Sequence, residues 1–365
     1  MKNDKVRIGV IGVGAIGPSH VYSIQRTEGC ALAAICDLRA DAAARIAGEN
    51  GVPYFTSVKD MVQGDTVDAV TISTPSGFHL DTALEAIEAG KHVLSEKPLE
   101  ITTERIDRII AAADRKRVKL GGVFQCRFSP VVRRLKKLVD GGLLGEIYAG
   151  SVYMKRFRTQ AYYDSAGWRG TWKVDGGGCL MNQGIHYVDL FLWFMGEAQE
   201  VIAITETVGR KVEVETLALS LVKFASGARG VVEGTTLAYP EIPSYLEIFG
   251  SRGTLSFNSE KVLRMDLIDP TPAEASERDA LFALRAELEA KKAGEKKTVA
   301  AGTAVPSLDM GHGPVIADFV EAIRTDRAPF VNGPEARRAV ELITAIYESG
   351  RNGSRPVPIT RKGDG

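Results

Sequence analysis

A lysine and a histidine in this sequence have the chemistry needed to oxidise an alcohol or reduce a ketone. Lys97 lies in the segment H-V-L-S-E-K-P, and His186 lies in the segment G-G-G-C-L-M-N-Q-G-I-H-Y-V-D. Removal of a hydride from a carbinol carbon requires a base for the hydroxyl proton and a cation or donor for the developing alkoxide. Imidazole exchanges protons near neutral pH. We therefore expect His186 to take the proton and Lys97 to stabilise the oxyanion.

Two other residues in the second segment are candidates for supporting roles. Asn182 precedes His186 by four residues, so we expect both side chains on one face of a helix over residues 182–195. Asn182 can orient a substrate or a catalytic group, but it cannot exchange a proton. Asp189 is expected to be a partner of another side chain or a group on the helix surface, and not a proton carrier. The other histidines, expected as caps, hydrogen-bonded loop residues or cofactor neighbours, are His20, His79, His92 and His312.

Three glycines near the N-terminus indicate what accepts the hydride. Gly12, Gly14 and Gly17 form the pattern G-x-G-x-x-G between an apolar strand, Val6–Ile11, and a helical stretch. In that context the first glycine permits a tight turn, the second lets the backbone approach a pyrophosphate, and the third allows close packing of helix and strand. The helix N-terminus attracts the phosphates. The pattern predicts a dinucleotide site.

An acidic residue selects between the two nicotinamide cofactors. Asp37 follows Gly17 by twenty residues at the end of the second strand, where a carboxylate accepts hydrogen bonds from the adenosine ribose. It would repel a 2′-phosphate, so NAD is favoured, while the nearby Arg39 leaves NADP open. The residues expected to bind the cofactor are Gly12, Gly14, Ala15, Ile16, Gly17, Asp37, Arg39, Ser73, Thr74, Pro75, His79, Glu96, Lys97 and Gln125.

The elements that must position these residues fall into two groups. Residues 6–122 alternate between short apolar strands and helical stretches, which predicts a doubly wound parallel sheet of the Rossmann type. Later strands follow one another with hairpin-like spacers, which predicts an open, mostly antiparallel sheet in an α/β domain. We expect a Rossmann domain at 1–125 and a substrate-binding domain at 126–365. Residues 270–306 are charged and Ala-rich and are interpreted as a surface excursion without chemistry.

Composition excludes several other classes of protein. The 365 residues hold 46 Lys and Arg against 46 Asp and Glu, so there is no basic excess of the kind that nucleic-acid binding requires. No apolar run is long enough to span a bilayer, and no secretory signal is apparent, so we expect a cytoplasmic protein. The four cysteines, Cys30, Cys36, Cys126 and Cys179, match no metal-site spacing and are expected to be small core residues without disulfides.

Taken together, these motifs resemble the Gfo/Idh/MocA family of oxidoreductases over nearly the whole chain. They are G-V-G-A-I-G at 12–17, S-T-P-S-G-F-H at 73–79, S-E-K-P at 95–98 and the glycine-rich segment at 176–189. The resemblance implies that Lys97 lies beside the nicotinamide, often before a cis peptide at Pro98, and that His186 is the acid–base residue. It implies a sugar, sugar-derivative or polyol substrate, and a homodimer or homotetramer formed through the second sheet.

The resemblance also leaves alternatives open. The inositol dehydrogenase branch has Asp where this chain has Asn182, whereas the N-Q-G-I-H version resembles the branch that acts on nucleotide sugars and anhydro-sugars. Besides net oxidation, a redox-assisted lyase or epimerase that recycles NAD is an open alternative, as is a non-catalytic dinucleotide sensor. Aromatic faces and guanidinium groups suit sugar rings, hydroxyls and carboxylates. The residues expected to bind substrate are Tyr162, Tyr163, Trp168, Arg169, Trp172, Asn182 and His186.

Overall fold

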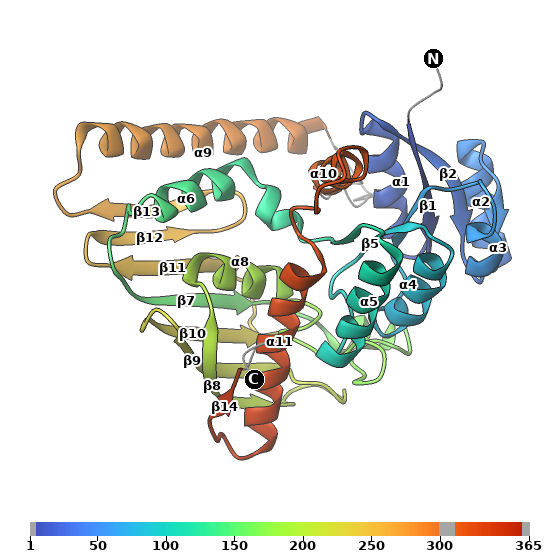
Figure 1. Cartoon of the computed structure of the whole chain (residues 1–365). Coiled ribbons are helices and arrows are strands. Elements are labelled where there is room, and N and C mark those ends of the chain that lie inside the picture. The colour runs from blue at the N-terminus through green and yellow to red at the C-terminus, as the bar shows by residue number, and fades with distance from the viewer. Residues whose placement is uncertain (1–4, 299–310, 360–365) are drawn as a thin grey trace.

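The strands of the first sheet are short apolar runs. Helices cover both faces of this sheet, so side chains on both sides of each strand are buried. A computed structural model describes residues 5–298 and 311–359 (Figure 1). The six parallel strands are β1 (Val6–Ile11), β2 (Cys30–Cys36), β3 (Tyr54–Phe55), β4 (Ala69–Ile72), β5 (His92–Ser95) and β6 (Leu120–Gly122). Their order is β3-β2-β1-β4-β5-β6, which confirms the predicted Rossmann sheet.

The strand order reverses between β1 and β4, so the loops after β1, β4 and β5 line one crevice at the carboxyl edge of the sheet. The glycine pattern, Ser73 and Lys97 all lie in these loops. The helices of this part are α1 (Gly17–Arg26), α2 (Ala40–Asn50), α3 (Val58–Val62), α4 (His79–Glu88) and α5 (Thr103–Lys116), with short 3-10 turns η1 (Ser76–Phe78) and η2 (Gln125–Phe128).

The second sheet alternates buried and exposed residues because helices cover only one of its faces. Its strands are β7 (Ile147–Lys155), β8 (Ala198–Glu206), β9 (Leu217–Phe224), β10 (Arg229–Thr235), β11 (Tyr245–Gly250), β12 (Gly253–Phe257), β13 (Val262–Leu267) and β14 (Val357–Pro358). The order is β13-β12-β11-β7-β10-β9-β8-β14, and all pairs except β7 with β10 are antiparallel. This confirms the predicted, mostly antiparallel sheet.

The remaining helices follow β6, the last strand of the first sheet, along the chain. They are α6 (Pro130–Asp140), α7 (Gln160–Asp164), α8 (Ile185–Met195), α9 (Pro272–Thr298), α10 (His312–Arg324) and α11 (Gly333–Arg351). Helices α6, α8 and α11 lie on the covered face of the second sheet, whereas α10 returns to pack on α1 (Figure 1). Residues 272–298 of the expected surface excursion form α9, and residues 299–306 lie outside the described part. None of the described helices is long and apolar enough to cross a bilayer.

A buried arginine joins three of these elements. Arg127 of η2 donates to both carboxylate oxygens of Asp189 on α8, at 2.8 and 2.7 Å. Its remaining terminal nitrogen donates to Glu335 on α11 at 2.8 Å. Burial tends to raise the pKa of Asp189, and the arginine opposes that effect. This ion pair fixes α8, and with it His186, relative to the first sheet. Asp189 therefore has the supporting role that was expected of it.

Because this ion pair is buried, removal of its cation leaves an unpaired carboxylate away from water. We predict that Arg127→Leu lowers the free energy of unfolding by about 3–5 kcal/mol, measured by urea denaturation. Arg127→Leu combined with Asp189→Leu should cost less than the sum of the two single changes. The exposed Arg133 provides the control, since Arg133→Leu should stay within about 1 kcal/mol. An Arg127→Leu loss of that smaller size would contradict the structural role assigned here.

Candidate active site

The glycine loop after β1 leaves open backbone where a phosphate would lie. A Cβ on Gly12 would come within 2.9 Å of the Ser73 backbone, and a Cβ on Gly17 would collide with the carbonyl oxygen of Gly12. A Cβ on Gly14, in contrast, would meet no atom within 4 Å. Gly14 and Ala15 are exposed at the N-terminus of α1. The loop therefore has the close packing and the open face that a pyrophosphate site needs.

Asp37, at the end of β2, organises this loop. Its carboxylate accepts the backbone N–H groups of Val13 and Arg39, each at 2.9 Å, and the Arg39 side chain at 3.2 Å. Burial alone would raise the pKa of Asp37, but these hydrogen bonds outweigh that effect and the pKa lies below its ordinary value. The carboxylate is thus ionised beside the glycine loop, as recognition of ribose hydroxyls requires, and Arg39 is already paired with it.

The loop after β4 is tied to both of its neighbours. Ser73 donates its hydroxyl to the Gly12 carbonyl at 2.7 Å. The His79 ring lies 2.9 Å from the Thr74 carbonyl and 2.9 Å from the Pro98 carbonyl, so it links the β4 and β5 loops. His79 is therefore occupied by backbone partners. Pro75, the next residue of the loop, is partly buried and caps η1.

Among the buried polar atoms that have no hydrogen-bond partner in the described residues, two lie in the segments that follow strands at this edge. They are Oγ1 of Thr74, after β4, and Oε1 of Gln125, in η2 after β6. Buried polar atoms are normally paired, so each marks a place where a bound molecule supplies the missing partner. The open glycine loop, the ionised Asp37 and these two atoms together fit a dinucleotide that lies across the carboxyl edge of the first sheet.

The side chain of Lys97 crosses from this edge to the second domain. Lys97 follows β5, forms a cis peptide bond with Pro98, and donates from Nζ to the Asn182 carbonyl at 3.0 Å. Burial lowers the pKa of its ammonium group, while the carboxylates of Glu96 and Asp175 act to raise it. The lysine is thus a partly buried cation with N–H groups left for a substrate oxygen.

His186 lies in the first turn of α8, on the same side of the molecule as Lys97. Burial lowers the pKa of the imidazole to about 3, and the positive charge of Lys97 is the next largest cause. Nδ1 has no partner among the described residues, and the ring contacts the edge of Phe124 with centroids 5.8 Å apart. A neutral imidazole beside an ammonium group can accept a proton while the lysine stabilises negative charge.

Asn182 supports this pair, but from outside the helix. The prediction that it shares a helix face with His186 was wrong, since α8 begins at Ile185 and Asn182 lies in the preceding turn. The cause is Glu215, whose carboxylate binds the backbone N–H groups of Gly178 and Leu180 at 2.8 and 2.9 Å and holds the turn in place. From this turn Asn182 presents its carbonyl to the lysine.

A polar network extends from Asn182 toward solvent. Its amide nitrogen donates to Asp175, a buried carboxylate whose pKa is raised by burial, and its side-chain oxygen accepts from Gln183. Gln183 also donates to the Tyr162 hydroxyl at 2.9 Å, and Arg169 donates to the same hydroxyl at 2.7 Å. The network therefore links the predicted residues Tyr162 and Arg169 to Asn182, which binds Lys97.

The structure places the other predicted substrate residues differently. The Trp168 ring lies against the Arg169 guanidinium, 4.5 Å from its centroid, which holds that side chain in place. Tyr163 donates to Thr236 at 3.0 Å beneath the network. Trp172 packs edge-on against Tyr347 of α11, with centroids 5.1 Å apart, and takes no part in the network around Asn182.

An open hollow of about 500 Å³ lies on the solvent side of this network. Arg169, Gly170 and Tyr163 are among its lining residues, and neither Lys97 nor His186 is. Since Gly170 donates its N–H to Asp175, the hollow borders the polar network without reaching Lys97 or His186.

Sequence reasoning missed four residues of this site. Asp175 directly precedes the glycine run at 176–178, and Gln183 directly follows Asn182. These positions next to recognised motif residues could have identified both. Arg156 and Arg158 follow β7 two residues apart and both pair with Glu241, at 2.7 and 3.0 Å. Their period-two spacing at a strand end could have indicated that both lie on one face.

Comparison with known proteins agrees with this arrangement. Residues 6–123 match the model described as "Oxidoreductase family, NAD-binding Rossmann fold", and residues 132–256 match the "GFO/IDH/MocA C-terminal domain". Myo-inositol 2-dehydrogenase of Thermotoga maritima is 28% identical over 72% of this chain and 78% of its own length. Inositol 2-dehydrogenase 3 of Saccharopolyspora erythraea is 30% identical over 68% and 72%.

Solved structures resemble the whole chain. The WlbA dehydrogenase from Bordetella pertussis, in complex with NADH and UDP-GlcNAcA, superposes with a TM-score of 0.87 and 31% identity, covering 99% of this chain and 100% of that one. Levoglucosan dehydrogenase, in complex with NADH and levoglucosan, shares the fold at a TM-score of 0.79 and 22% identity, covering 98% and 100%. With its glycine loop, its paired lysine and histidine and these matches across both domains, the chain belongs to the Gfo/Idh/MocA family of NAD-dependent oxidoreductases.

Proposed function

We propose that this enzyme uses NAD to oxidise a secondary hydroxyl of an acidic sugar derivative. The observation that carries the proposal is the placement of Lys97 and His186 together, where the dinucleotide crevice meets the second domain. NAD held by the glycine loop, Asp37 and the β4 loop supplies the hydride acceptor. The family places NAD at the first sheet, and the assignment of individual residues is our own.

The two catalytic side chains have complementary roles. His186, neutral because burial and the Lys97 charge lower its pKa, accepts the hydroxyl proton of the substrate. The carbinol carbon loses its hydrogen with both electrons and becomes a carbonyl carbon. Lys97 donates to the oxygen as negative charge develops there, and its bond to the Asn182 carbonyl keeps the ammonium group in position.

The charge of the site favours a substrate that carries an anionic group. Arg156 and Arg158 share one carboxylate, Glu241. Arg169 forms no ion pair in the described part of the chain, and its Nε has no hydrogen-bond partner there. An arginine held by a tyrosine hydroxyl and a tryptophan face, with a nitrogen free, suits a planar carboxylate.

Similarity supports the same class of substrate. The structure with 31% identity over nearly the whole chain holds UDP-GlcNAcA, a nucleotide sugar with an acidic sugar ring, together with NADH. The hollow beside Arg169 offers space for the part of such a substrate that lies beyond the reacting sugar. We therefore propose a sugar carboxylate, with a nucleotide sugar as the first to test.

The role of Lys97 is tested by its removal. Lys97→Ala should lower kcat for NADH formation at least 100-fold, since a positioned donor to the oxyanion contributes about that much. NADH binding, followed by fluorescence, should persist. Lys91→Ala provides the control, because that lysine donates to the Gly64 carbonyl at the surface, away from Lys97. Unchanged turnover without Lys97 would reject its role, and turnover without net NADH would favour a lyase or epimerase that recycles the cofactor.

The proposed anion site is tested by Arg169→Met. We expect KM for UDP-GlcNAcA to rise about 10- to 100-fold, the effect of losing one charge-assisted hydrogen bond, while kcat changes little. The counterpart UDP-GlcNAc, whose sugar ring lacks the carboxylate, should be a poor substrate of both proteins and insensitive to the change. Arg45→Met, at an exposed ion pair of α2, is the control. Equal sensitivity of the acidic and neutral sugars would contradict the assignment.

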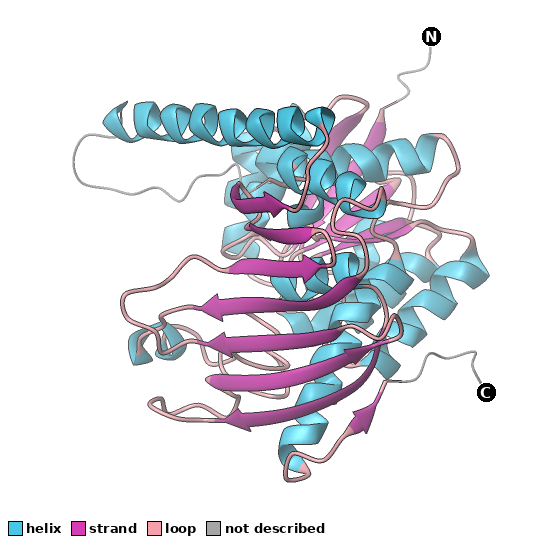
Figure 2. Ribbon diagram, turned by 90° about the vertical axis from the view of Figure 1, so that its left-hand side faces the viewer, coloured by secondary structure: helices cyan, strands magenta, loops and turns pink. Residues whose placement is uncertain are grey.

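We propose that a second copy of the chain covers the open face of the second sheet. Figure 2 shows that face without a described helix across its strands. It presents a band of partly exposed apolar side chains on adjacent strands, since Ile202 pairs with Leu221, and Ile204 with Leu219. Large apolar bands of this kind mark protein interfaces.

A negative charge introduced into this apolar band tests the proposed interface. Leu221, 61% exposed at the centre of the band, is the residue to change. Leu221→Glu should convert the assembly to a smaller species in size-exclusion chromatography with light scattering, because the carboxylate would be buried unpaired. Leu38→Glu, at a more exposed leucine of the first domain, should leave the mass unchanged. A wild-type monomer would overturn the proposal.

A further inference from the structure

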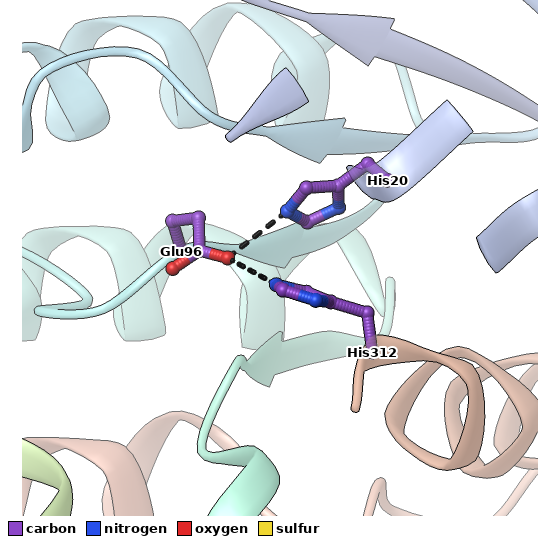
Figure 3. Close-up of side chains that lie close together, drawn as sticks. All are labelled: His20, Glu96 and His312. Atoms are coloured by element: carbon purple, nitrogen blue, oxygen red, sulfur yellow. Dashed lines mark hydrogen bonds and ion pairs between the residues drawn. The ribbon is translucent and has the colours of Figure 1, made fainter. Parts of the chain in front are cut away.

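Three buried side chains from distant parts of the chain meet behind Lys97. His20 comes from α1, Glu96 follows β5, and His312 begins α10 (Figure 3). Nε2 of each histidine lies within hydrogen-bond distance of the same carboxylate oxygen, Oε1 of Glu96, at 3.0 Å for His20 and 2.9 Å for His312. The two rings lie 4.7 Å apart. We call these residues the His–Glu–His cluster.

The other carboxylate oxygen of Glu96 connects the cluster to the catalytic residue. Oε2 accepts the backbone N–H of Lys97 at 3.1 Å. On its other side the peptide of Lys97 leads to Pro98, whose carbonyl is held by His79. The backbone that carries the ammonium group is therefore fixed at both ends, and one of those two fixing points depends on the histidines.

The geometry favours hydrogen bonds over a bound metal ion. Two histidines and a carboxylate do form the one potential metal-ligand group in the described residues, and such a set suits a transition metal. However, ligands about 2.0 Å from a tetrahedral ion lie roughly 3.3 Å apart, whereas both histidines approach the same oxygen at 2.9–3.0 Å. That spacing fits two N–H donors on one carboxylate.

The charges in the cluster agree with that assignment. Burial lowers the pKa of His20, so the ring is neutral and can donate from Nε2. Burial opposes ionisation of Glu96, but hydrogen bonds from both histidines outweigh that effect and hold the pKa of its carboxyl well below the usual range. Glu96 is thus a buried carboxylate whose charge acts on the Lys97 ammonium.

We propose that His20 and His312 are positioning residues for hydride transfer, which hold Glu96 so that it orients the Lys97 backbone and keeps its side chain charged. The proposal rests on the role given above to Lys97. It makes the catalytic geometry depend on α10, a helix from the C-terminal part of the chain that packs on α1.

Other groups also act on the Lys97 charge, so the contribution of Glu96 must be separated from theirs. Asp175, in the loop before the glycine run, raises the pKa of Lys97, whereas Arg156, after β7, lowers it. Cys126 of η2 and His186 of α8 also face the ammonium group. Removal of the Glu96 charge alone should lower the pKa of Lys97, so the ammonium group would be lost at a lower pH.

The first test measures that charge without substrate or cofactor. In protein with 15N-labelled lysine, Nζ of Lys97 is assigned from the signal that Lys97→Arg removes, and its titration midpoint is followed. Glu96→Gln should lower the midpoint by about one pH unit or more, whereas Glu88→Gln, an exposed carboxylate of α4, should not. An unchanged midpoint in Glu96→Gln would overturn the electrostatic part even if no sugar substrate were found.

The second test separates positioning from folding. His312→Leu should lower kcat about ten-fold or more, with KM and NADH affinity within two-fold of wild type. His312→Gln, whose amide nitrogen can replace Nε2, should restore kcat to within three-fold at the same Tm as His312→Leu. Failure of Gln to rescue at matched Tm would reject the positioning role. His92→Leu, at a histidine of β5 that bonds Lys119, is the control.

The third test addresses the metal alternative directly. Co²⁺ added to the wild-type protein should give no visible ligand-field absorption of tetrahedral or five-coordinate cobalt. A stoichiometric band that His312→Leu abolishes would show that the cluster binds metal and would overturn its assignment as a hydrogen-bonded unit.

Discussion

A lysine ammonium group that is withdrawn from water needs compensating interactions from the protein. The positions of the other polar groups of the site follow from this requirement. Isolated buried charges are costly. Lys97 receives its compensation from the Asn182 carbonyl and from the carboxylates of Glu96 and Asp175. One carboxylate lies in the first domain and the other in the second. The Lys97 ammonium group therefore has its full set of compensating interactions only when both domains are assembled around it.

The supporting ion pairs follow from the same constraint. The positive charge of Lys97 lowers the pKa of His186, so the two side chains lie near each other. The buried Arg127–Asp189 pair fixes α8, which carries the histidine. Glu215 plays a similar part for the turn that carries Asn182, through two backbone N–H groups. In each case a buried carboxylate on one element holds a functional segment of another, so the site has little freedom to rearrange.

The features that could be predicted from sequence are those encoded locally. The glycine pattern, the E-K-P segment and His186 each lie within a short motif at the end of a strand or the start of a helix, and the strand–helix alternation determined the sheet on which they lie. The Asn182 prediction failed because residue spacing cannot show that Glu215, which lies just before β9, accepts the backbone N–H groups of the turn that precedes α8. The link between Glu96 and His312 spans 216 residues and left no local signal. The pairing of Arg156 and Arg158 with Glu241 was hidden for the same reason.

The late position of His312 has a consequence for biosynthesis. Because it follows Glu96 by 216 residues, a ribosome that adds roughly 5–20 residues per second exposes the carboxylate about 10–40 s before its second histidine is made. The nascent first domain can fold around the glycine loop in that interval. With the positioning role proposed for His312, the hydrogen bonds behind Lys97 are completed only after α10 has docked, so the first domain can fold before its second histidine holds Glu96.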